Sequence, residues 1–185
     1  MDSLTDQLLI SMPHLSDVFF EKTVIYICAS DSSGAMGMVV NRPLMSARVA
    51  AILEALDLGE GDSDTNIREV FYGGPVQPSL GFVLHSPEYA LDSTEQISDS
   101  VALSTSLEII QDIQDGTGPA FYRFTLGYAG WGPEQLEREI ANGDWLLIPA
   151  ESEIIFKKPD HIKWEESARQ LGIEITQIGG GAGQS

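Results

Sequence analysis

The segment TVIYICA at residues 23–29 constrains the fold more than any other part of the chain, because it predicts a strand with two apolar faces. Its residues are mainly β-branched or aromatic, which favours a strand. Alternate side chains of a strand share a face. The first face carries Val24, Tyr26 and Cys28, and the second carries Ile25 and Ile27. We therefore predict a central strand in a sheet that is covered on both sides.

A hairpin is predicted over residues 23–41, because the turn sequence DSSG separates this strand from the run AMGMVVN. Other β-branched and aromatic runs predict strands, and apolar residues spaced three and four apart predict helices. Ser46 is predicted to cap the first helix, and Ser104 or Thr105 the second. The remaining predicted strands cover residues 7–12, 68–74, 80–86, 101–104, 120–128, 145–150 and 173–176, and the predicted helices cover 47–57, 105–114, 133–142 and 159–172.

The order of these elements predicts an α+β fold. Hairpin-like neighbours dominate the first half, and strand–helix alternation appears in the second. This order favours a large mixed β-sheet with about four packed helices over a doubly wound parallel sheet. With 185 residues, 43% of them hydrophobic, the chain can bury a full core without metal or disulfide support. We predict a single compact domain over residues 1–178 and a disordered glycine-rich tail over 179–185.

The chain is strongly acidic, with 28 acidic and 10 basic residues and a formal net charge of −18 at pH 7. Such a charge repels nucleic acids and anionic membranes at long range. The adjacent pair Lys157-Lys158 is too small to form a basic patch. We therefore expect no direct nucleic-acid binding. We also expect no membrane association, because no apolar run approaches the roughly 18–20 residues that span a bilayer.

The cysteine content and the N-terminal sequence bear on the cellular compartment. Cys28 is the single cysteine, which excludes an internal disulfide and fits a reducing compartment. The sequence MDSLTDQLLISMPHL has two acids among its first six residues and no basic region, unlike a signal peptide. We expect a soluble cytoplasmic protein, and we favour a monomer.

The stretch LGYAGWGPEQLEREI at 126–140 resembles a phosphate-binding turn, because three glycines stand between a predicted strand and a predicted helix. Its order G-x-x-G-x-G differs from the dinucleotide fingerprint, and no Lys-Ser or Lys-Thr follows as in a P-loop. Pro133 removes one donor, and Glu134 and Glu137 repel phosphate. We interpret the glycines as a tight structural turn, with an anion site as the minor alternative.

No motif predicts a metal site or a cofactor. GDSDTN at 61–66 resembles the start of a calcium loop. It lacks the glycine and the glutamate that such a loop needs, so we interpret it as a solvated acidic loop. His14, His85 and His161 are scattered without zinc spacing. Of these, His85 ends a predicted strand, where it has a structural role or lines a cleft.

Cys28 and the segment at 120–124 each have an alternative interpretation. Cys28 is expected to be a buried thiol that acts as a small hydrophobe. If it lies at the exposed end of its strand, a redox or ligand role opens. AFYRF at 120–124 surrounds an arginine with aromatic residues, as RNA-binding strands do, but lacks the glycine and the basic start of that signature. We interpret it as core residues plus an exposed Arg123.

Several segments, taken together and in order, resemble the YqgE/AlgH family of bacterial proteins. They are QLLISMPHLSDVFFEKTVIYIC (7–28), GAMGMVVNRPL (34–44), YGGPVQPSLGFVLHS (72–86), LGYAGWGPEQLEREI (126–140) with NGDWLLIPA (142–150), and IIFKKPDHIKWEESARQLGI (154–173). The resemblance spans nearly the whole chain and implies a compact α+β domain with a large mixed sheet. It implies no settled activity and no agreed catalytic set. Some family members are labelled transcriptional regulators after a role in exopolysaccharide control.

The resemblance also indicates a candidate binding surface, made of the family-matching positions best suited to line a shared surface. These are Asn41, Gly73, Gly74, Pro75, His85, Gly127, Tyr128 and Trp131. Many family members have Glu-His after the strand cysteine, where this chain has Ala29-Ser30. A catalytic Cys–His pair is therefore not expected here.

The main hypothesis is a non-enzymatic binding or regulatory domain that acts through a protein or small-molecule partner and regulates transcription indirectly. It follows from the resemblance and from the lack of a complete catalytic constellation. The alternative is an enzyme or a thiol-based redox sensor that uses Cys28 or a cleft near His85 and Tyr128. Glycine-rich strand ends, which often frame clefts, motivate it. Direct DNA binding is disfavoured by the charge.

Overall fold

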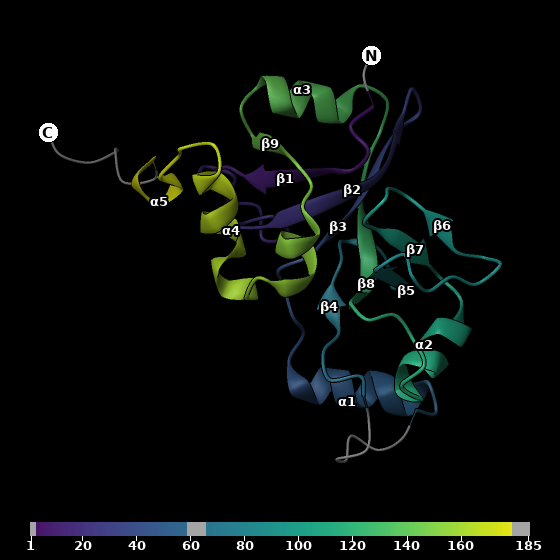
Figure 1. Ribbon diagram of the computed structural model, residues 1–185. Helices are drawn as coiled ribbons and strands as arrows, with labels where there is room; N and C mark the ends of the chain where they lie inside the picture. The colour runs from purple at the N-terminus through teal and green to yellow at the C-terminus, as the bar shows by residue number, and fades with distance from the viewer. Residues whose placement is uncertain (1–2, 59–65, 179–185) are drawn as a thin grey trace, which may run out of the picture.

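Within the described residues, nine strands form one curled sheet, and helices pack around it (Figure 1). The computed structural model describes residues 3–58 and 66–178, so most of the predicted acidic loop and the whole glycine-rich tail lie outside the described residues. In chain order the elements are β1 (Gln7–Ser11), β2 (Val24–Asp31), β3 (Gly34–Val39), α1 (Ser46–Ala55), β4 (Phe71–Tyr72), β5 (Val76–His85), β6 (Glu95–Gln96), β7 (Ala102–Ser104), α2 (Leu107–Gln114), β8 (Tyr122–Trp131), α3 (Gln135–Ala141), β9 (Trp145–Pro149), a π-helical turn (Glu153–Lys157), α4 (Asp160–Arg169) and α5 (Ile175–Ile178).

The sheet topology confirms the predicted α+β class with a large mixed sheet. The strands follow the order β6-β7-β5-β8-β3-β2-β1-β9, and β4 pairs with β8 beside this path. Pairs along the path are antiparallel, whereas β4 and β8 run parallel. The hairpin predicted over residues 23–41 is present as β2 and β3. β8 joins the two halves of the sheet, because it pairs with β5 along one edge and with β3 and β4 along the other.

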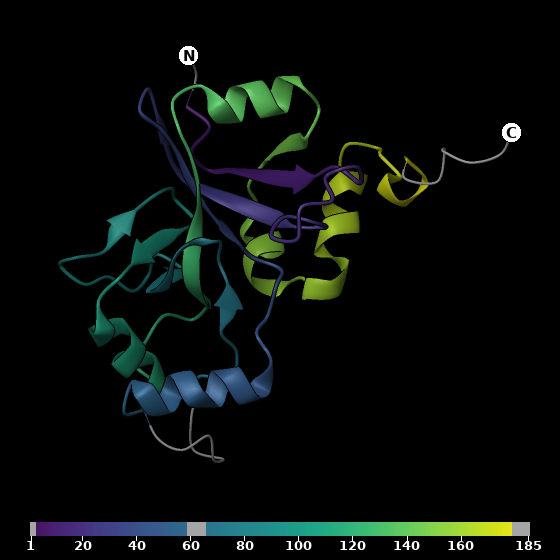
Figure 2. The same ribbon diagram turned by 180° about the vertical axis from the view of Figure 1, so that it is seen from behind.

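β2 lies between β3 and β1 and is buried over its first five residues, as its two apolar faces predicted. One face belongs to a core cluster that contains Trp164 of α4, and the other to a cluster that contains Leu136 of α3. The first face carries Val24, Tyr26 and Cys28, and the second carries Ile25 and Ile27. Figures 1 and 2 both show α3 and α4 on different sides of β1. The two helices supply the cover that a doubly apolar strand requires.

A third core cluster lies at the other end of the sheet, where α1 and α2 pack against β5 and β8. Val49 and Leu53 come from α1, Ile110 comes from α2, and Val83 and Phe124 come from the sheet. Both ribbon views show α1 and α2 side by side, at a distance from α3 and α4 (Figure 2). The periodicity of both helices predicted these inward faces.

β8 corrects the interpretation of the glycine stretch, because the strand continues through Trp131 instead of ending near residue 128. Gly127 and Gly130 therefore lie inside a strand, and the chain turns only after Trp131. Gly127 has a φ of +73°, and a Cβ there would stand 2.3 Å from the carbonyl oxygen of Gly74. The glycine allows two backbones to approach closely, which explains a turn-like composition within a strand.

The strand predicted over 173–176 is wrong, because this segment enters the short helix α5. Its alternating apolar residues do not distinguish a strand from a helical turn in so short a run. Ile175 is buried in the core cluster that contains Trp164 of α4. Burial of one side chain against a helix satisfies this segment without strand pairing.

The predicted helix caps are also wrong. Met45 precedes α1 and Ser106 precedes α2, and neither side chain makes a capping hydrogen bond. Ser46 is instead the first residue of α1. Leu107 has the three-residue spacing from Ile110 that predicts a shared inward face, yet Leu107 is 70% exposed whereas Ile110 is buried. Leu107 is the first residue of α2, ahead of the buried Ile109 and Ile110.

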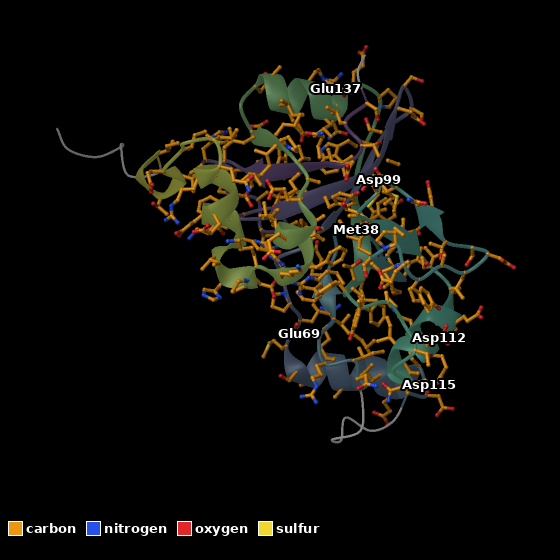
Figure 3. The ribbon with its side chains drawn as sticks, in the orientation of Figure 1. Met38, Glu69, Asp99, Asp112, Asp115 and Glu137 are labelled. Atoms are coloured by element: carbon orange, nitrogen blue, oxygen red, sulfur yellow. The ribbon has the colours of Figure 1, made fainter. Side chains whose placement is uncertain are left out.

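The acidic side chains are spread over the molecule (Figure 3). The labelled acids are Glu69 ahead of β4, Asp99 between β6 and β7, Asp112 on α2, Asp115 at its end, and Glu137 on α3. Met38, also labelled, is buried between them in the core. Dispersed charge of this kind is typical of a solvated surface. None of the helices within residues 3–58 and 66–178 combines the length and apolar character needed to cross a membrane.

Replacing Gly127 with alanine is predicted to lower the free energy of unfolding by about 3 kcal/mol. Alanine disfavours the left-handed backbone conformation of this position, and its Cβ would overlap the carbonyl oxygen of Gly74. Gly143 is the matched control, because its φ is +83° and nothing lies within 4 Å of its would-be Cβ. Gly143→Ala should cost about 1 kcal/mol. Urea unfolding of both variants measures the difference, and equal losses would contradict the close approach of the two backbones.

Candidate functional site

A wide bulge in β5 shapes one end of the molecule. Val76 pairs with Tyr128 and Gly81 pairs with Leu126, so the four residues 77–80 oppose the single residue Gly127 of β8. A bulge of this kind removes residues from the ladder and redirects their side chains. The segment 77–80 is not paired with β8, and its residues Pro78, Ser79 and Leu80 form one wall of a cavity beside α1 and α2.

A cavity of about 500 Å³ lies between this wall, α1, α2 and β8, and we name it the α1–α2 cavity. Its volume lies within the range of small-molecule sites, roughly 300–1,000 Å³. The lining residues are Arg48, Ile52, Ala55 and Leu56 from α1, Pro78, Ser79, Leu80, Gly81 and Val83 from β5, Ser104, Thr105, Ser106, Leu107 and Ile110 around the start of α2, and Phe124 and Leu126 from β8.

The chemistry of the α1–α2 cavity is mainly apolar, with a few polar groups. Hydroxyl groups come from the serines and the threonine of the lining, and the charge comes from Arg48. Leu80 and Leu107 are 43% and 70% exposed although they are large and apolar. The Ser106 hydroxyl is buried and has no hydrogen-bond partner within the described part of the chain. Apolar walls with a few polar groups are typical of a site for a small organic ligand.

The glycines of the predicted surface meet each other through their backbones. The Gly73 N–H donates to the Leu126 carbonyl at 2.8 Å, and the Gly73 carbonyl accepts from Val39 N–H at 2.9 Å. A Cβ on Gly74 would stand 2.1 Å from the Tyr128 backbone. These contacts insert residues 71–74 between β3 and β8. The half-buried Pro75 then leads directly into β5.

Asn41 joins two strands instead of facing a cavity. Its Oδ1 accepts a hydrogen bond from Val24 N–H at 2.9 Å, and its Nδ2 donates to the Lys22 carbonyl at 2.9 Å. Val24 is the first residue of β2, and Lys22 lies two residues before it. The side chain thus satisfies backbone groups where the β2–β3 ladder ends, a structural role that needs an amide with both a donor and an acceptor.

His85 is fully buried at the end of β5. Its Nδ1 lies 3.0 Å from the Ser86 carbonyl, and its Nε2 lies 2.9 Å from the Ser104 hydroxyl. A carbonyl only accepts, so Nδ1 donates to Ser86 and Nε2 accepts from Ser104. Ser104 in turn lies 2.7 Å from the Thr94 hydroxyl. Burial lowers the pKa of His85, which favours this neutral, fully satisfied arrangement.

Tyr128 and Trp131 are brought together at a second concavity, the hairpin groove, beside the β2–β3 turn. The groove holds about 430 Å³ and also includes Ala29 and Ser30, which stand where the family resemblance places Glu-His. The indole N–H of Trp131 donates to Glu139 at 2.9 Å. Trp145 donates to the same carboxylate oxygen at 2.9 Å. The fold therefore uses Trp131 mainly to attach α3 to the sheet.

Cys28 is buried, with 4% of its surface exposed, at the point where β2 has a bulge. Burial, with the nearby Glu95 charge, raises the pKa of the Cys28 thiol above its ordinary range. A raised pKa disfavours the thiolate, which is the reactive form. Neither the α1–α2 cavity nor the hairpin groove includes Cys28 or His85 in its lining.

The expectation that Arg123 is exposed is wrong, because only 7% of it is accessible. Its Nε donates to the Ile155 carbonyl at 2.9 Å, and its guanidinium lies 3.6 Å from Asp160. It also stacks over Phe71 at 4.6 Å from the ring centroid. The alternation of β8 turns Arg123 inward, and the partners that compensate for its burial come from a segment more than 30 residues away.

Lys163 of α4 completes this buried cluster and was not identified from the sequence. Its Nζ donates to the Val40 carbonyl at 3.0 Å, to the Ile155 carbonyl at 3.2 Å and to Asp160 at 2.7 Å. The lysine thus ties β3 and the π-helical turn to α4. Burial, with the Arg123 charge, lowers the pKa of Lys163 to about 8. The sequence feature that could have indicated a buried lysine is its position beside Trp164, because both residues lie on the buried face of α4.

Within the described residues, no three His, Cys, Asp or Glu side chains gather in an arrangement that could hold a metal ion. His14 pairs with Asp144 at 3.2 Å across the surface. The calcium-like sequence at 61–66 lies almost wholly outside the described residues.

The fold and its cavities define a class: an α+β domain with a curled nine-stranded sheet and an apolar cavity under two helices. The solution structure of the AlgH protein from Pseudomonas aeruginosa has this fold, with a TM-score of 0.79, 36% sequence identity and coverage of 99% of this chain and 96% of that one. Protein DIP2367 from Corynebacterium diphtheriae matches with a TM-score of 0.72 and 19% identity, covering 97% of this chain and 92% of that one.

Sequence comparison leads to the same family. The chain is 43% identical to a UPF0301 protein of Shewanella denitrificans, over 96% of each chain. It is 42% identical to a UPF0301 protein of Psychrobacter cryohalolentis, over 99% of this chain and 98% of that one. The AlgH-like family model matches residues 8–176. The chain therefore belongs to the AlgH-like family, as the resemblance to the YqgE/AlgH family predicted.

Cys28 is predicted to react slowly with a thiol reagent in the native state, because it is buried and its thiolate is disfavoured. The double variant Cys28→Ala/Ala29→Cys moves the thiol to the exposed neighbouring position. It should react roughly a hundredfold faster or more. Native labelling rates across pH measure this. Equal rates for the two thiols would support the redox-sensor alternative.

Lys163 is predicted to add a pH dependence to stability. Its folded pKa is lowered to about 8 from its ordinary value of 10.5, so between these values the unfolded state binds more protons. The free energy of unfolding of the wild type minus that of Lys163→Met should therefore rise by about 3 kcal/mol between pH 8 and 10.5. The tyrosines and Cys28 titrate in both proteins and cancel in the difference. Urea unfolding measures it, and a flat difference would contradict the shifted pKa.

Proposed function

We propose that this protein is a non-enzymatic binding domain whose ligand is a small molecule held in the α1–α2 cavity. The observation that carries the proposal is the cavity itself: about 500 Å³, mainly apolar, and bordered by the exposed Leu80 and Leu107. Exposed large apolar groups beside a concave apolar surface mark binding sites more often than inert surface. Ligand binding there would regulate a partner or pathway, and any effect on transcription would be indirect.

The charge of the protein supports an indirect role. A net charge of −18 opposes binding to DNA, and the buried Arg123 and Lys163 are engaged inside the fold. They are therefore not free to contact phosphates. We further propose that the protein is a monomer in the cytoplasm. Its single, buried thiol fits a reducing compartment.

The enzymatic alternative is weaker on chemical grounds. Ser104 and His85 lie at hydrogen-bond distance, as a nucleophile and its base would. The Ser104 residue is only 1% exposed, and its hydroxyl also accepts from Thr94. The thiol alternative has the same difficulty, because the Cys28 thiolate is disfavoured.

The hairpin groove stays a candidate surface for a protein partner. Tyr128 and Trp131, from the predicted binding surface, border it together with the exposed Ala29. Its polar hydrogen-bonding groups, including Ser30 and Asp31, suit a protein contact more than an apolar small molecule. The two concavities allow a ligand and a partner to bind at separate places.

The neutral apolar dye N-phenyl-1-naphthylamine is predicted to bind the purified protein with an increase in fluorescence. Ala55→Trp places a large side chain on α1 within the lining of the cavity and should weaken binding at least about tenfold. Ala51→Trp is the matched control, since Ala51 is exposed on the same helix and outside the lining. It should leave binding unchanged.

Two results would count against the proposed function. One is a dye that does not bind the native protein, and the other is equal loss of binding in both tryptophan variants. Thermal unfolding of the variants confirms that each remains folded at the temperature of the titration.

A further inference from the structure

We propose that the ligands of the α1–α2 cavity are single-chain amphiphiles with a carboxylate head, and that Arg48 binds the carboxylate. This inference rests on the proposed function and adds the chemical class of the ligand. It stands on the charge of the lining, on the free guanidinium of Arg48 and on the apolar walls.

The charge of the lining is opposite to that of the whole chain. The chain has 28 acidic and 10 basic residues, yet the sixteen lining residues within the described part of the chain include no Asp or Glu and one arginine. The head group of a neutral or cationic ligand gains no charge attraction from such a lining. An anionic head group meets the one opposite charge, and the lining residues that the structure describes present no carboxylate beside it.

The Arg48 side chain is free to bind a ligand. It is exposed on α1, and within the described residues it takes part in no ion pair or side-chain hydrogen bond. Two other arginines are engaged within the fold: Arg42 donates to three backbone carbonyls, and Arg123 is buried against Asp160. A guanidinium binds a carboxylate through two parallel hydrogen bonds, which gives strength and a fixed orientation.

The remainder of the cavity suits an alkyl chain. Ile52 and Leu56 of α1 and Phe124 and Leu126 of β8 contribute apolar side chains to its lining. Each methylene of a ligand that enters such walls leaves water and strengthens binding. The unpartnered hydroxyl of Ser106 adds an unused hydrogen-bonding group to the lining, which a ligand or its bound water can satisfy.

The net charge of the protein weakens anion binding at long range, and the experiment has to separate this effect from the local contact. At a salt concentration of about 0.15 M the Debye length is about 8 Å, so distant acids are largely screened. The contact with Arg48 is short and survives this screening. The measurement is therefore made at this ionic strength and at neutral pH.

Octanoate and 1-octanol share one alkyl chain and differ in the head group, so they test the proposal directly. Ligand-observed NMR titrations of the full chain should show octanoate binding about tenfold more tightly than 1-octanol. Arg48→Gln should remove this preference, because it weakens octanoate binding more than 1-octanol binding. Arg68→Gln, an exposed arginine outside the lining, is the matched control and should change neither.

The outcomes separate this inference from the proposed function. If 1-octanol binds as tightly as octanoate, or if Arg48→Gln keeps the preference, the carboxylate assignment is overturned and the cavity stands as a site for neutral apolar ligands. If neither binds while the dye does, the amphiphile class is overturned. If the dye also fails to bind, the proposed function is overturned as well.

Discussion

The close approach of the Gly74 and Gly127 backbones is the constraint on which the rest of the structure depends. A Cβ on Gly127 would meet the Gly74 carbonyl oxygen at 2.3 Å, so side chains are excluded where these segments touch. The contact lets residues 71–74 fill the gap between β3 and β8. Because β8 joins the two halves of the sheet, a change at this point affects both.

The α1–α2 cavity follows from the same constraint. Opposite Gly127, β5 has the four residues 77–80 where β8 has one, and a Cβ on Gly127 would stand 3.2 Å from the Pro78 Cα. The bulge becomes a wall, and α1 and α2 close the space above it. Arg123 and Lys163 attach α4 and the π-helical turn through carbonyl groups and Asp160. Buried charges thus hold α4 in place, while the space under α1 and α2 stays mainly apolar.

The parts of this structure that the sequence predicted are those with local causes. The two apolar faces of β2 and the turn DSSG lie within one short segment, so both β2 and its hairpin could be predicted. The role of Gly127 could not, because its reason is a backbone more than 50 residues away. Arg123 was assigned to the surface for the same reason, since its partners belong to an unrecognised π-helical turn. The cavity combines a bulge with two helices from distant segments, and no single segment predicts it.

The central claim is that ligands enter the α1–α2 cavity, and intermolecular nuclear Overhauser effects from bound N-phenyl-1-naphthylamine to protein methyl groups test it most directly. The account predicts contacts with the methyl groups of Val83, Ile110 and Leu126, which line that cavity. Contacts instead with Met36 and Val76, which line the hairpin groove, would contradict it.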